Sequence, residues 1–243
     1  MGRRQASPSH QLTILWHALD QPEVVHRIGD WLESVNDDFQ GAALQVVHEK
    51  RLIQLAPNLN ALIEADGPAR KTAILTAGKL KCELNLPALL KLADQQDPDL
   101  DWPLAIALSN FPDGGRLHLR RIFHAVHADE ERPAPWGDHR LGSIQSDTMT
   151  EFLRWQRTRN ASDFRKKVRV TAAGGLAKTG DREAISFLVG MLYDPDERGG
   201  SYQVYGQSRN AAEALCDAFG WPVEPRSGMI ERVRTLARDR LGS

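Results

Sequence analysis

Residues 70–98 read RKTAILTAGKLKCELNLPALLKLADQQDP, and this stretch decides the fold class. Apolar residues recur at the spacing of one helix face over residues 70–80, and a second series follows over residues 86–93 after a break. Pro87 fits the first turn of the second series, because the N–H group that proline lacks has no partner at that position of a helix. The stretch therefore predicts two helices joined by a short turn.

Nearly the same pattern returns in residues 165–195, RKKVRVTAAGGLAKTGDREAISFLVGMLYDP. Both copies contain a small-residue segment that ends in leucine, AGKL at residues 77–80 and AGGL at residues 173–176. Both also end in Asp-Pro and are followed directly by another Asp, and this Asp-Pro-Asp sequence stops a helix and turns the chain. The copies lie about three periods of ~32 residues apart, and a period of this size indicates a repeat protein.

The rest of the chain fits the same pattern with less regular spacing. The alternating pattern of a β-strand is weak throughout the sequence. Three further helix pairs are expected at residues 39–65, at residues 102–126 with a break at 112–115, and at residues 209–241 with a break at 220–222. Residues 1–38 are expected to hold N-terminal capping helices, and residues 128–147 and 197–207 are expected to be insertion loops. The predicted fold class is all-α, as a single domain over residues 1–243.

Composition sets the protein class. The 243 residues, 27.1 kDa, are 41% hydrophobic and 26% charged, so the chain has enough apolar residues to bury a core. The 31 Lys and Arg nearly balance the 32 Asp and Glu, so the protein as a whole has no strong electrostatic field. The only two cysteines, Cys82 and Cys216, lie in helical apolar patterns, where they are expected to be buried small residues rather than nucleophiles. This usage, with no apolar run near the ~18 residues of a membrane span and no signal peptide, predicts a cytoplasmic protein.

The paired-helix units resemble the HEAT-like repeats first named from phycobiliprotein lyases. Residues 165–195 and 70–98 match best, and residues 210–215, NAAEAL, match the first helix of such a unit. The resemblance covers about two thirds of the chain strongly and the N-terminal third weakly. It implies an α-solenoid of antiparallel helix pairs, wound as a right-handed superhelix, in which small residues let neighbouring helices approach closely. It also implies binding along a concave face, but no particular reaction.

In this repeat family the second helix of each pair usually lines the concave face, which draws attention to residues 116–127. Arg116, Arg120, His124 and His127 share one face of that helix, opposite an apolar stripe. Such a row suits an acidic partner surface, although an ordinary solvated face has the same pattern. The histidine pair lacks further ligands at metal-binding spacing, so no metal site is predicted.

A denser basic run covers residues 154–169 and includes Arg154, Trp155 and Arg157. Basic side chains with interleaved aromatic residues can hold phosphates and stack on bases, and a solvated face with Trp155 in the core is the alternative. A DNA-repair branch of small HEAT-like solenoids, the alkylpurine glycosylases, has a similar length. Trp102, Trp136, Trp155 and Asp101 or Asp163 are possible counterparts of its tryptophans and carboxylate, but no local motif aligns them.

The loop of residues 199–205 carries Tyr202 and Tyr205, a residue type enriched at contact surfaces, or is merely a tolerated insertion. No motif of a known catalytic class occurs, so no catalytic residue or cofactor is predicted. We therefore expect a non-enzymatic scaffold, adaptor or neutralising factor that binds another protein with an acidic surface. Nucleic-acid binding through residues 154–169 is the alternative, and a chromophore-lyase role is a weaker one.

Overall fold

The computed structural model describes residues 18–125, 164–193, 207–222 and 228–241. Every regular element among them is a helix, which confirms the all-α prediction for this part of the chain. Several predicted contact residues lie outside the described residues: His127, Arg154, Trp155, Arg157, Tyr202 and Tyr205. The same holds for the insertion loop at 128–147 and for residues 197–206 of the second insertion, whereas residue 207 already belongs to a helix.

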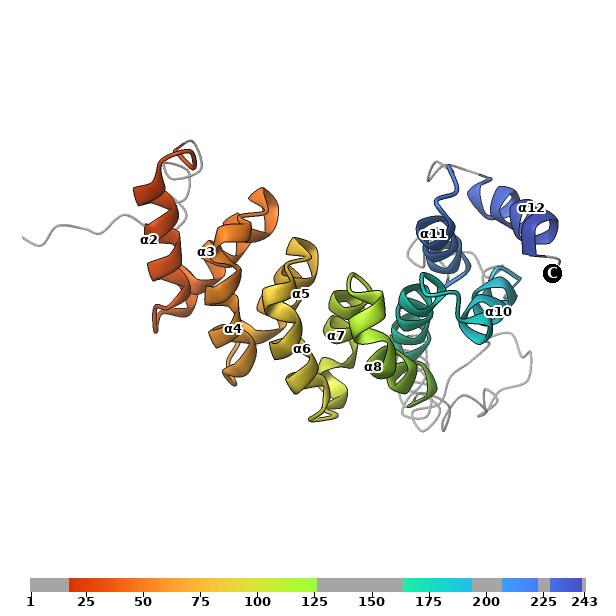
Figure 1. Ribbon diagram of the computed structural model, residues 1–243, viewed down its shortest axis with the longest axis horizontal. Helices are drawn as coiled ribbons and strands as arrows, with labels where there is room; N and C mark the ends of the chain where they lie inside the picture. The colour runs from red at the N-terminus through yellow and green to blue at the C-terminus, as the bar shows by residue number, and fades with distance from the viewer. Residues whose placement is uncertain (1–17, 126–163, 194–206, 223–227, 242–243) are drawn as a thin grey trace, which may run out of the picture. The chain divides into compact units, whose positions relative to one another are not determined.

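From α2 to α8 the helices follow one another with short connections (Figure 1). Their bounds are α2 Pro22–Leu32, α3 Asp37–Lys50, α4 Ala56–Glu64, α5 Arg70–Leu80, α6 Leu86–Ala93, α7 Asp101–Leu108, α8 Pro112–Ala125, a helix of residues 164–177, α10 Arg182–Met191, α11 Gln207–Phe219 and α12 Met229–Leu241. Three 3₁₀ turns, η1 Ile53–Leu55, η2 Glu83–Asn85 and η3 Pro98–Leu100, precede α4, α6 and α7. The chain divides into two compact units, residues 1–118 and 119–243, and the division falls within α8.

In the first unit each helix packs against the next repeat as well as against its neighbour in sequence. The first helices of successive pairs pack in series, α3 on α5 and α5 on α7, and α4 packs on α5 and α6 (Figure 1). The positions of buried side chains repeat in the same way. Two series of residues that are at most 7% exposed recur at intervals of 30 residues: Leu32, Leu62 and Leu92, and Leu44, Ile74 and Leu104. Each pair thus buries the same faces against its neighbours.

The turn inside each of two successive pairs has the same construction. Arg51 and Lys81, 30 residues apart, end α3 and α5 in the left-handed conformation, with φ of 53° and 52°. A 3₁₀ turn follows each of them, and Pro57 and Pro87 then stand in the first turn of α4 and α6. The predicted place of Pro87 is confirmed. The third pair differs, because α8 begins at Pro112, inside the stretch that was expected to break the helix.

Small residues set the distance between first helices, as the sequence predicted. A Cβ atom on Gly78 of α5 would lie 2.5 Å from the Cα and 2.9 Å from the Cβ of Ala107 in α7. In the second unit, a Cβ on Gly174 would lie 3.0 Å from the Cβ of Ala214 in α11. Contacts under 3.0 Å do not occur between packed carbon atoms, so the α5–α7 crossing requires glycine at residue 78.

His48 gives the first unit a pH dependence. Its Nδ1 lies 3.4 Å from Oγ1 of the buried Thr76, across the contact between α3 and α5. Burial, reinforced by the charge of Lys79 and opposed by that of Glu49, lowers the pKa of His48 below 6.5. The unfolded chain therefore binds a proton more readily than the folded chain in this range, and stability rises with pH.

We expect the neutral His48 to contribute its full stability above pH 6.5, and this contribution to be lost as the pH falls through the lowered pKa. Urea unfolding followed by circular dichroism between pH 5 and pH 8 measures it. The His48→Gln variant should lose less stability than the wild type on acidification, because glutamine does not titrate. Equal losses in the two proteins would contradict the assignment.

Candidate binding surface

Helix α8 separates its apolar and polar residues as predicted. Leu119, Ile122 and Phe123 are buried, at most 1% exposed, and form the stripe that holds the helix in place. The residues of the predicted basic row that the structure describes, Arg116, Arg120 and His124, are all exposed. The periodicity of the sequence therefore identified the exposed face of α8, but not what that face contacts.

Arg120 is held by a carboxylate that lies far away in the sequence. Its Nη2 donates to Oδ2 of Asp181 at 3.0 Å. The Asp181 side chain is only 3% exposed, whereas that of Arg120 is 50% exposed. Asp181 is also the N-cap of α10, where its Oδ1 accepts the backbone N–H of Ala184 at 3.2 Å. Gly180, with φ of 76°, turns the chain into this cap.

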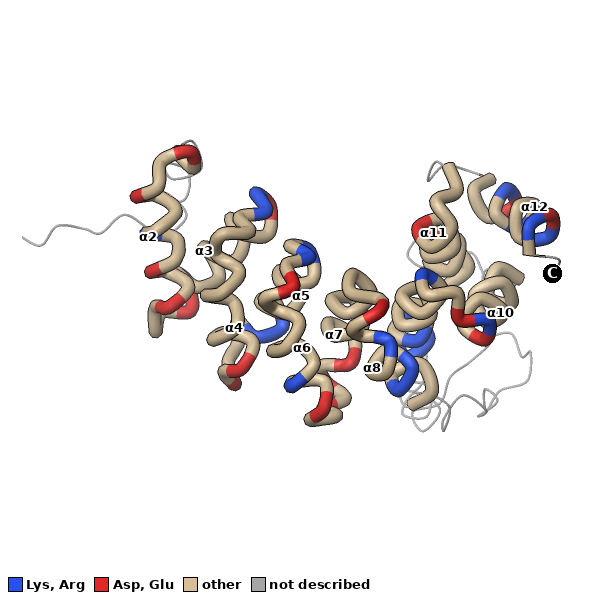
Figure 2. Tube along the Cα trace, in the orientation of Figure 1, with Lys and Arg blue, Asp and Glu red and all other residues tan. Residues whose placement is uncertain are grey.

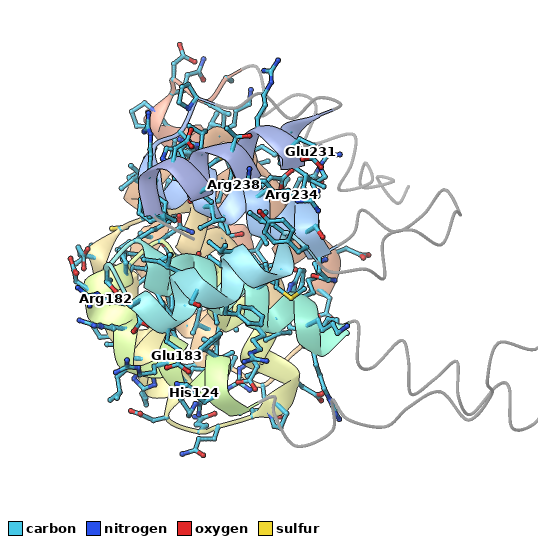
Figure 3. All side chains as sticks on the ribbon, turned by 90° about the vertical axis from the view of Figure 1, so that its right-hand side faces the viewer. His124, Arg182, Glu183, Glu231, Arg234 and Arg238 are labelled. Atoms are coloured by element: carbon cyan, nitrogen blue, oxygen red, sulfur yellow. The ribbon has the colours of Figure 1, made fainter. Side chains whose placement is uncertain are left out.

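His124, one turn after Arg120, makes the next contact between α8 and α10. Its Nε2 lies 3.6 Å from Oε2 of Glu183, and both side chains are about half exposed. Figure 3 shows these two residues next to each other, with Arg182 at the start of the same helix α10. Glu183 suits the first turn of α10, because a carboxylate there complements the helix dipole. Arg182 is exposed to solvent.

The basic run joins the same group of helices through Arg169. The guanidinium of Arg169 lies 4.2 Å from the ring centroid of Phe187 in α10 and 4.9 Å from that of Phe123 in α8. Cation–π contacts of this kind fix the helix of residues 164–177 against its neighbours. Arg165 and Lys167, from the same run, face solvent, and Lys166 is half-buried. Two regions that were separate candidates in the sequence thus lie on one group of three helices, where Figure 2 shows basic residues on α8 and on the adjoining helix.

We call Arg120, His124, Asp181, Arg182 and Glu183 the α8–α10 surface. Sequence analysis missed three of these residues, Asp181, Arg182 and Glu183. The pattern Gly180-Asp181 before an apolar helix is an N-cap signal and could have identified Asp181 as a cap. No sequence signal pairs it with Arg120, because the two residues are brought together only by the packing of α8 on α10.

Other arginines of the second unit differ in role. Arg234 of α12 donates through Nε to the carbonyl of Leu192 at 2.9 Å, and its Nη2 reaches the same oxygen. Its Nη1 bonds Glu231, and its guanidinium lies 4.7 Å from the Tyr193 ring centroid. Arg234 therefore fastens α12 to the end of α10 (Figure 3). Arg238 of the same helix is exposed and serves below as a control.

Cys82 and Cys216 are free thiols, and both are half-buried rather than fully buried as expected. Burial, with a smaller effect of Glu213, raises the pKa of Cys216, which keeps this thiol protonated and weakly nucleophilic. No group of three metal-ligating side chains occurs among the described residues. Asp101 and Trp102 begin α7 in the first unit, and the other proposed repair-enzyme counterparts lie outside the described residues.

No protein-family profile, no curated protein and no solved structure matches this chain. Within the residues that the structure describes, none of the helices has the length and apolar character needed to cross a membrane.

Proposed function

We propose that the chain is a HEAT-like α-solenoid, wound as a right-handed superhelix, that acts without catalysis as an adaptor for another protein. The 30-residue recurrence of buried residues and the packing of successive pairs, both in the first unit, support the repeat architecture. The free half-buried cysteines support a reducing compartment such as the cytoplasm. The α8–α10 surface is the contact surface in this proposal.

The observation that carries the proposal is the presence of both charge signs on the α8–α10 surface. The exposed Arg120 and Arg182 share this surface with the exposed Glu183, and the buried carboxylate of Asp181 is bonded to Arg120. A flexible protein segment can place its carboxylates against the arginines and away from the exposed Glu183, whereas the regularly spaced phosphates of a duplex cannot all avoid it. The partner's surface should be predominantly acidic, because residues 119–243 hold 20 Lys and Arg against 17 Asp and Glu, compared with 11 against 15 in residues 1–118.

Charge reversal at Arg182 tests the proposal. We expect Arg182→Glu to reduce retention of the protein partner about tenfold, because a carboxylate then faces an acidic surface. The measurement is a quantitative pull-down from native lysate with the tagged full-length chain. Glutamate at the first position of α10 complements the helix dipole, so the variant should fold as well as the wild type.

Arg238→Glu is the matched control. It makes the same charge change at an exposed arginine of the same unit, but in the last turn of α12, where glutamate opposes the helix dipole. Any general loss of stability therefore affects the control more than the test variant. Equal retention by the two variants would refute the α8–α10 surface, and no stoichiometric protein on the wild type would refute the adaptor function.

One observation favours a second candidate, nucleic-acid binding. Residues 164–180 contain Arg165, Lys166, Lys167, Arg169 and Lys178 and no Asp or Glu, and Arg165 and Lys167 are exposed. The same pull-down separates the two candidates. Retained material that nuclease removes, with retention that falls steeply between low and high salt, would support phosphate binding instead of protein binding.

A further inference from the structure

Arg120 uses little of its hydrogen-bonding capacity inside the protein. A guanidinium carries five N–H donors in a planar fork. Among the described residues, Arg120 makes one side-chain bond, from Nη2 to Oδ2 of Asp181, and half of its side chain is exposed. One N–H group of the guanidinium is thus bonded to Asp181, while the other N–H donors can reach a ligand in solvent.

The carboxylate that holds Arg120 is itself immobile. Asp181 is buried, and its second oxygen is engaged by the backbone N–H of Ala184 at the start of α10. With both oxygens occupied, the carboxylate has one orientation, and the guanidinium bonded to it is confined as well. An arginine that is confined before binding loses less conformational entropy when it binds.

We propose that Asp181 is a positioning residue, and that Arg120, held by it, receives a carboxylate of the protein partner through two parallel N–H···O bonds. Arginine and carboxylate match in this geometry, which gives directional specificity. The inference rests on the proposed function, because it assigns the chemistry of the same α8–α10 surface. It goes further by giving the buried carboxylate of Asp181 a role in recognising acidic groups.

Positioning and simple charge attraction predict opposite effects of Asp181→Asn. The substitution removes a negative charge, so attraction alone would make the surface more positive and an acidic ligand would bind more tightly. Asparagine has one side-chain oxygen, and asparagine caps helices as well as aspartate does, so that oxygen can keep the bond to the Ala184 N–H. The side-chain NH2 group of asparagine then faces the N–H donor of Arg120. Two donors cannot hydrogen-bond to each other, so Arg120 is no longer held in place. Positioning therefore predicts weaker binding.

The experiment measures the fluorescence anisotropy of a labelled decaglutamate peptide with the full-length chain, at a temperature where circular dichroism shows every variant folded. We expect Asp181→Asn to weaken binding about fivefold. Arg120→Lys, which keeps the charge but loses the fork, should weaken binding by a similar factor. The double variant should bind no more weakly than Arg120→Lys alone, because Asp181 acts through the fork of Arg120.

The outcomes separate the two proposals. Unchanged or tighter binding by Asp181→Asn, or additive effects in the double variant, would overturn the positioning role and leave the adaptor function intact. No binding of decaglutamate by the wild type would overturn the carboxylate receptor. Tighter wild-type binding to a labelled duplex DNA of equal charge would overturn it as well, in favour of phosphate binding.

Discussion

The Gly78→Val variant is expected to be less stable than the wild type by about 3 kcal/mol, at the upper end of the cost of overpacking a core. The new Cβ would lie 2.5 Å from the Cα of Ala107. A backbone atom cannot rotate away, so α5 and α7 must separate along their contact, and the stiff valine side chain adds to the strain. Thermal unfolding followed by circular dichroism measures the loss, expected as roughly 6–12 °C for a chain of this size.

Gly41→Val is the matched control. Gly41 lies in α3, is exposed, and has no atom within 4 Å of the position that a Cβ would take. Valine has a higher helix propensity than glycine, so this variant should be slightly more stable than the wild type, by less than about 0.5 kcal/mol. If the two variants melt alike, close approach of α5 and α7 is not what stabilises the repeat stack.

The helix pairs could be predicted from sequence because local signals specify them. Periodicity placed the apolar faces, and Pro87 marked the start of α6. The pattern of residues 112–115, with Pro112, Gly114 and Gly115, predicts a break that the structure instead places at residues 109–111. In the structure Pro112 begins α8, and the two glycines pack closely: a Cβ on Gly114 would lie 2.6 Å from Leu86, and one on Gly115 2.9 Å from Leu108. Glycine that serves close packing cannot be told from glycine that ends a helix by sequence pattern alone.

The candidate surface was predicted only in part for a similar reason. The exposure of Arg116, Arg120 and His124 follows from the helical period of α8. The partners of these residues do not. Asp181 meets Arg120 from 61 positions away, and Arg169 contacts two phenylalanine rings of different helices. Such contacts depend on how helices pack, and the hydrophobic pattern specifies which face packs but not which polar residues meet at its edge.

Removal of the Arg120 side chain should have the second large effect on stability. Arg120→Ala removes the guanidinium charge beside the buried carboxylate of Asp181, and with it the bond between Nη2 and Oδ2. Stranding a buried charge costs 3–5 kcal/mol when both partners are buried. Since Arg120 is half exposed and water can reach the vacated position, we expect a smaller loss of about 2–3 kcal/mol. Urea unfolding at pH 7 measures it.

Two further variants decide whether the loss of the charge pair between Arg120 and Asp181 is the cause. Arg182→Ala removes the arginine next to Asp181, and because Arg182 is exposed, its loss should change stability by less than about 0.5 kcal/mol. Adding Asp181→Asn to Arg120→Ala should restore part of the lost stability, since the carboxylate charge is then absent while the helix cap remains. If the double variant is instead less stable than Arg120→Ala, the arginine stabilises α8 through packing of its aliphatic stem, and Asp181 contributes to the fold independently of it.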